Sequence, residues 1–317
     1  MTDPKLSKPH TSKTHFTISE FSEKGWATGG TILDPKPCHS LRQWIDDRRP
    51  IDSTIFYHSE DAFNEKGRWS NYAPGRADHN LLISPEVDLA FIENNYEFKC
   101  FATELVGKDY SIMKKSVIRS VPHSVIPDWM TGYLSEVGRP NLNPFIKDEF
   151  QDIQYFLSTD FHQDKTRPNS NFVTVYIYLD EVDESDSALH ILSGSHKLGM
   201  THYPHLLRRS HLNTSLWYYS DFNGNHETCT EETVVGQPGT VFSFHCLTLH
   251  GTGPNNSAAP RISLRYLLSK SPNSGTDSLL DRANRQVYGP HQISNARLDI
   301  SVDGSFHRTG SSLLSYY

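Results

Sequence analysis

Short strands separated by turn residues recur in the second half of the chain, and this pattern limits the fold most strongly. From residue 151 onward, β-branched and aromatic runs alternate with turns that contain Gly, Asn or Pro. The clearest run is 171–179, and turns at 236–239 and 254–257 precede expected strands at 240–244 and 261–268. Many short strands at such spacing are typical of a jelly roll.

The first half of the chain predicts further secondary-structure elements that flank this core. Residues 1–17 are polar, so we expect a mobile segment. Segment 40–47 begins with Ser and has apolar positions 41, 44 and 45, which predicts a short amphipathic helix outside the barrel. Segment 109–121 reads as a strand, and 132–144, rich in Gly, Pro and Asn, as a loop.

No Gly/Ser or Pro linker divides the chain, so we predict one domain over residues 18–317. Its expected fold is mainly β (α+β), with flanking helices around a double-stranded β-helix. This cupin-like jelly-roll core is expected at about residues 109–270.

The composition argues against some classes of binding partner and indicates where the protein is located. A net charge of -7, from 30 basic and 37 acidic residues, argues against nucleic acid or an anionic membrane surface as the main partner. No apolar run approaches the ~20 residues that span a bilayer, and the start of the sequence lacks the apolar stretch of a signal peptide. We therefore expect a cytoplasmic protein, with the oligomeric state left open.

Cys38, Cys100, Cys229 and Cys246 lack paired spacing and are expected to be reduced, buried thiols.

His162 and Asp164 are the strongest candidates for chemistry. Side chains at i and i+2 of a strand point to the same face, roughly 6 to 7 Å apart along the backbone, which a metal can bridge. About two His-x-Asp/Glu matches are expected by chance in a chain with 17 His and 37 acidic residues. The other match, His58 and Glu60, precedes a loop-like segment, whereas His162 and Asp164 precede the strand at 171–179. We therefore favour the pair at 162 and 164 as metal ligands.

His250 and Arg261 could complete this site from the expected strands downstream. Two imidazoles and one carboxylate can cover one face of a divalent iron and leave the opposite face for other ligands. His245 competes with His250 but has the opposite strand parity, so we expect it to face away. Arg261 and Ser263 share one face of the last strand, and a guanidinium binds a carboxylate through two parallel hydrogen bonds. Arg265 falls on the same face and is a weaker alternative.

Several segments in order resemble the phytanoyl-CoA dioxygenase family of Fe(II)/2-oxoglutarate-dependent oxygenases. They are Phe161–Asp164, Leu179–Gly199, Gly236–Phe244 and Leu249–Ser257, closed by Pro260 and Arg261. The family usually has Glu-Asn-Gly-Pro-Leu before its Pro-Gly-Ser-His. This chain has Glu-Ser-Asp-Ser-Ala-Leu at 184–189 before Ser-Gly-Ser-His at 193–196, so we expect the loop at the site mouth to differ.

The resemblance implies a set of roles for the site residues. His162, Asp164 and His250 would bind Fe(II), and Arg261 would anchor the distal carboxylate of 2-oxoglutarate. Thr252 matches a hydroxyl position that the family uses for that carboxylate, and Ser263 could add another. Such an enzyme consumes O2 and 2-oxoglutarate and releases succinate and CO2.

The expected reaction is hydroxylation of an unactivated C–H bond of a small molecule of the metabolite, amino acid, acyl or sugar-acid type. Asp164 fills the third protein position and leaves no site for a halide. Desaturation, cyclisation and epoxidation use the same centre and stay open. The alternative is a cupin-like metal-binding protein or isomerase that does not use 2-oxoglutarate, which would share the metal ligands but would not need Arg261 and Thr252.

Candidates for substrate contacts are Tyr176, Trp217 and Arg208. Tyr176 shares a strand face with Thr174 and Tyr178, and this face either lines the barrel mouth or packs outside the barrel. Trp217 and Arg208 lie in the insert at 200–235, where we expect a lid over the iron. An aromatic cluster in such an insert is either a hydrophobic anchor or a wall of the substrate site.

Overall fold

The computed structural model describes residues 17–66, 82, 84–130, 145–150, 161–164, 171–201, 205–270, 277–288, 298–300 and 306–308. The expected mobile segment at 1–17 lies outside the described residues except for Thr17, which begins a short 3-10 helix. The loop expected at 132–144 also lies outside them.

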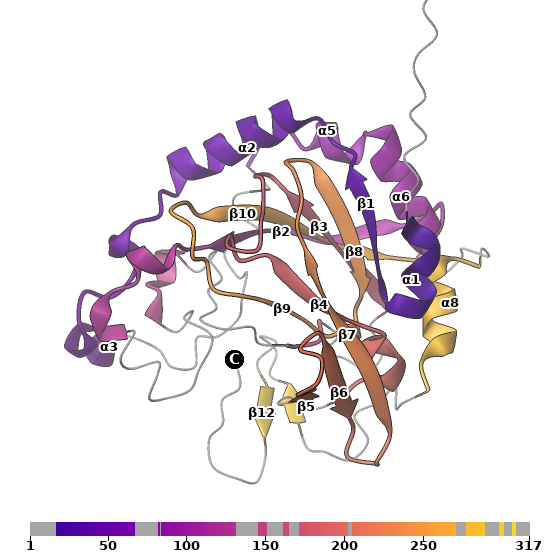
Figure 1. The fold of residues 1–317 in the computed structure, drawn as a ribbon. Coiled ribbons are helices and arrows are strands. Elements are labelled where there is room, and N and C mark those ends of the chain that lie inside the picture. The colour runs from indigo at the N-terminus through magenta and orange to yellow at the C-terminus, as the bar shows by residue number, and fades with distance from the viewer. Residues whose placement is uncertain are drawn as a thin grey trace, which may run out of the picture.

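Two five-stranded antiparallel sheets form the centre of the molecule (Figure 1). The first sheet has the strand order β1 (Trp26–Thr31), β8 (Thr240–His245), β3 (Phe172–Tyr178), β10 (Arg261–Ser269) and β2 (Ser111–Ser120). The second sheet has the order β5 (Leu206–Arg209), β6 (Leu216–Ser220), β7 (His226–Val234), β4 (Leu189–Ser193) and β9 (His250–Thr252). A separate hairpin joins β11 (Leu298–Ile300) and β12 (Phe306–Arg308).

In its second half the chain crosses repeatedly between the two sheets, as in a jelly roll. The chain passes from β3 in the first sheet to β4 in the second, then from β8 to β9 and back to β10. His162 extends the second sheet through a bridge to His250 of β9. The predicted jelly-roll core is therefore confirmed, and the strands expected at 109–121, 171–179, 240–244 and 261–268 are β2, β3, β8 and β10.

Helices surround the sheets at their outer side and ends. They are α1 (Phe21–Lys24), α2 (Pro35–Arg48), α3 (Glu60–Lys66), α5 (Ala90–Glu93), α6 (Tyr96–Val106) and α8 (Leu279–Gln286). The short 3-10 helices are η1 (Thr17–Glu20), η2 (Ser53–Ile55), η3 (His123–Val125), η5 (Asp148–Phe150) and η6 (Ser195–Leu198). Figure 1 shows α2, α5 and α6 along the outer side of the first sheet.

The two faces of the first sheet have different neighbours because strand side chains alternate. On β3 and β10, Val175 and Leu264 point outward into a core shared with the helices, as do Val173, Ile177, Ile262, Tyr266 and Leu268. The inward face of β3 places Tyr176 and Tyr178 against the second sheet, whose Leu189 and Ile191 belong to the same core cluster. The predicted parity of the last strand is therefore confirmed, and Arg261, Ser263 and Arg265 share its inner face.

Helix α2 starts five residues before the start that the sequence suggested. The side chain of Asp34 accepts a hydrogen bond from Lys36 N at 2.8 Å and caps the helix, and Pro35 opens it. Proline suits this position because the first helical N–H groups have no partner inside the helix. Cys38, Leu41 and Ile45 form the buried face, so the predicted amphipathic character is confirmed.

No helix in the described part of the chain has the length and apolar character needed to cross a bilayer. The four cysteines are free; Cys38, Cys229 and Cys246 are buried, whereas Cys100 is partly exposed. Burial raises the pKa of Cys38 and of Cys229 to about 12, so these two thiols are unreactive, as buried structural thiols are.

Candidate active site

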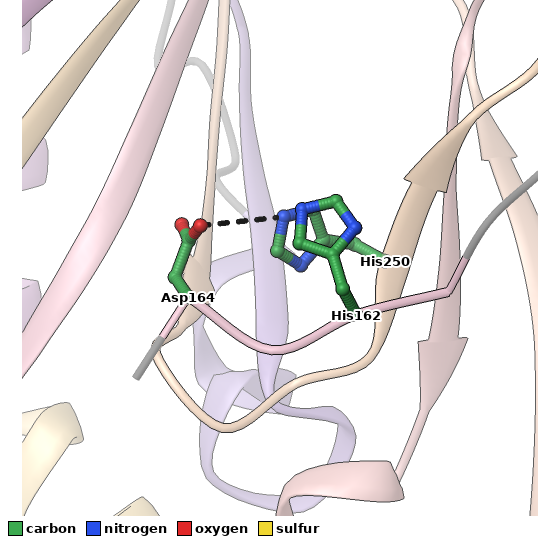
Figure 2. Close-up of side chains that lie close together, drawn as sticks. All are labelled: His162, Asp164 and His250. Atoms are coloured by element: carbon green, nitrogen blue, oxygen red, sulfur yellow. Dashed lines mark ion pairs between the residues drawn. The ribbon is translucent and has the colours of Figure 1, made fainter. Parts of the chain in front are cut away.

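His162, Asp164 and His250 meet at the edge of the second sheet. Each offers one ligand atom, and the three atoms lie within 4.8 Å of one another. Two backbone hydrogen bonds join the two His residues, from His162 N to His250 O at 2.9 Å and from His250 N to His162 O at 3.0 Å. Figure 2 shows both rings beside the carboxylate. Within the described ranges this is the one group of three or more His, Cys, Asp or Glu side chains placed to hold a metal.

His250 is held with one ring nitrogen free for a ligand. Its Nδ1 donates to Thr248 O at 3.0 Å, so Nε2, which lies 3.7 Å from Asp164 Oδ1, carries the lone pair. The ring of Phe244 packs against the imidazole with centroids 4.2 Å apart. Burial, supported by the nearby His162, lowers the pKa of His250 to about 3. The ring is therefore neutral at physiological pH, which is the form that binds a metal.

Asp164 is ionised and held by two donors from the first sheet. Thr174 Oγ1 donates to Oδ2 at 2.5 Å, and Arg265 Nη2 donates to Oδ1 at 2.8 Å. Burial acts to raise the pKa of Asp164, but Arg265, His250, His162 and the Thr174 hydrogen bond outweigh it and hold the pKa well below the usual range. Sequence reasoning missed both contacts: it placed Thr174 on a polar strand face and treated Arg265 as a clamp for a carboxylate ligand.

Arg261 is a buried guanidinium in the barrel interior. Its exposed fraction is 2%, and its Nε and Nη1 have no hydrogen-bond partner among the described residues. No described carboxylate forms an ion pair with Arg261; the Tyr178 hydroxyl interacts with it. Ser263 Oγ is also buried and has no hydrogen-bond partner in the described part of the chain, and Thr252 is buried on β9. Because a buried charge is costly unless it is paired, this arrangement fits an anionic ligand.

Tyr176 lies inside the barrel, which decides between the two positions considered for its strand face. Its ring stacks on Phe242 with centroids 5.6 Å apart and planes 22° apart, and it also contacts Phe244. Phe244 in turn packs against His250. Tyr176 is thus one ring removed from the metal ligands.

Trp217 and Arg208 are not brought together with the metal ligands. Trp217 Nε1 donates to Glu231 Oε2 at 2.7 Å, and its ring meets Phe161 edge-on at 5.3 Å. Arg208 is exposed and lies over Tyr218, 5.0 Å from the ring centroid. The described part of the insert forms β5, β6 and β7 of the second sheet. The lid expected from its composition stays a prediction.

We expect Trp217→Ala to lower thermal stability by several degrees, because it removes the Phe161 contact and the hydrogen bond to Glu231. Any turnover of 2-oxoglutarate per folded molecule should stay close to the wild-type value. Tyr218→Ala is the matched control, since Tyr218 is exposed on the opposite face of the same strand. Thermal unfolding monitored by circular dichroism checks the difference. A wild-type melting temperature in Trp217→Ala would show that this side chain is not a structural anchor.

The other histidines considered in the sequence analysis, His245 and His58, lie outside the metal site. His245 faces away from the cluster, as expected, and its Nε2 contacts Asn284 Oδ1 at 3.1 Å. His58 and Glu60 are both exposed.

Comparison with known proteins points to one family. Residues 143–263 match the sequence model of the family described as phytanoyl-CoA dioxygenase (PhyH). A probable alpha-ketoglutarate-dependent hypophosphite dioxygenase of Stutzerimonas stutzeri is 33% identical over 119 residues. This match spans 34% of the present chain and 37% of the relative.

Solved structures with low sequence identity are also similar. The crystal structure of AviO1 from Streptomyces viridochromogenes is 14% identical, with a TM-score of 0.44 over 82% of this chain and 95% of that chain. The alpha-ketoglutarate-dependent carbocyclase SnoK from nogalamycin biosynthesis is 14% identical, with a TM-score of 0.45 over 85% of this chain and 87% of that chain. The epimerase SnoN from the same biosynthesis is 14% identical, with a TM-score of 0.46 over 83% and 84%.

Proposed function

We propose that this chain is an Fe(II)/2-oxoglutarate-dependent dioxygenase of the phytanoyl-CoA dioxygenase family, whose sequence model matches residues 143–263. The observation that carries the proposal is the combination of two separate features in one barrel. One is the compact group of His162, Asp164 and His250. The other is the buried Arg261 guanidinium, which has no carboxylate partner among the described residues.

The three clustered side chains suit Fe(II). Two imidazoles and one carboxylate on a single side form the ligand set of non-haem iron oxygenases, with positions left open opposite them. The neutral His250 and the ionised Asp164 are already in the protonation states that bind a metal. When bound, iron and 2-oxoglutarate supply the activation of O2, with release of succinate and CO2.

Arg261 suits the far carboxylate of 2-oxoglutarate. A planar guanidinium holds a carboxylate by two parallel hydrogen bonds, and its Nε and Nη1 are the atoms that lack a partner. The hydroxyls of Ser263 and Thr252 are the further donors that we assign to this carboxylate. A cupin-like metal protein or isomerase without 2-oxoglutarate would gain nothing from burying such a guanidinium, so this observation favours the oxygenase.

For the reaction itself we propose hydroxylation of an unactivated C–H bond in a small molecule. Asp164 supports this outcome because it occupies the protein position that a halide would need. Tyr176 is the residue of the three substrate candidates that we retain, because it lies in the barrel next to Phe244 and His250.

Purified protein supplied with Fe(II), 2-oxoglutarate and O2 should form succinate without added substrate, at the slow rate of an uncoupled oxygenase. Succinate is measured by chromatography, with metal-free protein as the control. Candidate small molecules are then screened for a rate increase and for incorporation of one atom from 18O2 into the product. Iron binding without any succinate would favour the cupin-like alternative, and a product without 18O would contradict hydroxylation.

A further inference from the structure

We propose that Thr174 and Arg265 are positioning residues that hold Asp164 as a ligand through one oxygen only. This inference rests on the proposed function, because it concerns how the carboxylate meets the metal. Thr174 and Arg265 contact different oxygens of the same carboxylate, Oδ2 and Oδ1 respectively. Each oxygen therefore has its own donor from the protein.

The orientation of the carboxylate indicates which oxygen would meet a bound metal. Oδ1 lies 3.7 Å from His250 Nε2, the ring nitrogen that carries the lone pair. Figure 2 shows the carboxylate aimed at the two rings, with the dashed line marking this pair. Oδ2 accepts the Thr174 hydroxyl at 2.5 Å. Binding through Oδ1 alone keeps both hydrogen bonds, whereas chelation through both oxygens would require the carboxylate to turn and would weaken the bond from Thr174.

Binding through one oxygen rather than two would change how many coordination positions remain for other ligands. Ligation through one oxygen would leave the positions opposite the three side chains open for 2-oxoglutarate and O2. A chelating carboxylate would take one of those positions. The two donors thus act on coordination number through Asp164 without touching the metal.

The fold explains why the support must come from elsewhere in the chain. Asp164 lies in a short described segment, and the bridge of His162 to His250 is the strand pairing described for that segment. Thr174 and Arg265 stand on β3 and β10, which pair in the middle of the first sheet. In that register Thr174 faces Leu267, so Arg265 is its diagonal neighbour on the inner face. Two rigid strands therefore fix a side chain whose own backbone is not in a regular strand.

Arg265 also contributes charge. Its side chain is 14% exposed and that of Asp164 is 7% exposed, so the ion pair is shielded from water. Arg265 is bound to Asp164, whereas Arg261 has no described carboxylate partner. The two arginines therefore have different roles: Arg265 orients the metal ligand, and Arg261 binds the co-substrate.

Thr174→Val and Arg265→Lys test the inference on the full-length protein. Valine keeps the shape of threonine but cannot donate, and lysine keeps the charge but lacks the planar fork. Loss of a partner that orients a metal ligand typically weakens metal affinity by about 10-fold to 100-fold. We expect a weakening of about 10-fold for Co(II) in Thr174→Val, with a smaller effect in Arg265→Lys than in Arg265→Gln. The visible absorption of bound Co(II), which responds to coordination number, should change in Thr174→Val.

The affinity for 2-oxoglutarate, measured at saturating metal, should stay close to wild type in these variants. Ser243→Ala is the matched control, because Ser243 is a buried hydroxyl on the outward face of the same sheet, opposite Val175. Thermal unfolding of the metal-free proteins reports any general damage. The isosteric Thr174→Val change keeps the test valid if an Arg265 variant fails to fold.

Wild-type metal affinity and an unchanged Co(II) spectrum in Thr174→Val and Arg265→Gln would overturn the inference. So would a loss of 2-oxoglutarate affinity alone in Arg265→Gln, because Arg265 would then belong to the co-substrate clamp. If the wild-type protein itself bound neither Co(II) nor Fe(II), the proposed function would fail and this inference with it.

Discussion

His162→Ala and His250→Ala proteins should each lose Fe(II) binding and all turnover of 2-oxoglutarate. Two remaining ligands rarely hold Fe(II) against water, and the ligand atoms of these side chains lie within 4.8 Å of each other and of Asp164. Iron content after anaerobic loading and succinate formation measure the two losses. This is the largest effect that we expect from any single substitution.

His58→Ala is the matched control for these variants. His58 belongs to the second His-x-acid pair in the chain but is exposed and lies outside the cluster, so its removal should change neither measurement. Asp164→Gly adds a sharper distinction, because it opens a coordination position and should abolish hydroxylation even where some iron stays bound. Normal turnover in either histidine variant would contradict the assignment of the metal site.

Arg261→Ala should weaken the apparent affinity for 2-oxoglutarate by at least tenfold while leaving iron binding nearly unchanged. Removing one partner of a buried charge pair costs roughly 2 to 5 kcal/mol, and each 1.4 kcal/mol corresponds to about tenfold in affinity. The burial of Arg261 at 2% exposure places it in this range. The measurement is a 2-oxoglutarate titration of the iron-loaded protein without O2.

Arg261→Lys separates charge from geometry in the same experiment. Lysine keeps a positive charge but cannot form two parallel hydrogen bonds, so its affinity should fall between those of wild type and Arg261→Ala. Unaltered affinity in Arg261→Ala, together with a loss in Arg265→Ala at saturating metal, would move the clamp from Arg261 to Arg265.

The strands and their faces could be predicted from the sequence because side-chain alternation is a local property. The apolar run at 171–179 and the alternation from Arg261 to Leu268 are enough to place β3 and β10 and to assign their inner faces. The spacing of His162 and Asp164 likewise follows from the period of a strand. These features require no knowledge of which strands are neighbours.

Contacts between strands could not be predicted, because they depend on register. The hydrogen bonds of Thr174 and Arg265 to Asp164 require β3 beside β10 and the segment 161–164 across the barrel. Alternation fixes the face of a residue but not its partner on another strand. For the same reason, the pairing of β5 with β6 and of β6 with β7 could not be predicted from the sequence. From the sequence, Trp217 was expected to lie in a loop. In the structure it lies on β6 and donates a hydrogen bond to Glu231 on the neighbouring strand β7.

The start of helix α2 was missed for a different reason. A serine at position 40 resembles a cap, but Asp34 makes the capping hydrogen bond and two prolines occupy the first turn. Proline is usually read as the end of a helix, yet it is well tolerated in the first turn.

Anaerobic addition of Fe(II) and then 2-oxoglutarate to the metal-free protein tests the central claim most directly. If His162, Asp164 and His250 hold the metal and Arg261 orients the co-substrate, a weak visible charge-transfer band should appear with both components present. The band should saturate at one iron and one 2-oxoglutarate per chain and should be absent with either component alone. Tight iron binding with no band at saturating 2-oxoglutarate would contradict the claim that this barrel is a 2-oxoglutarate-dependent oxygenase.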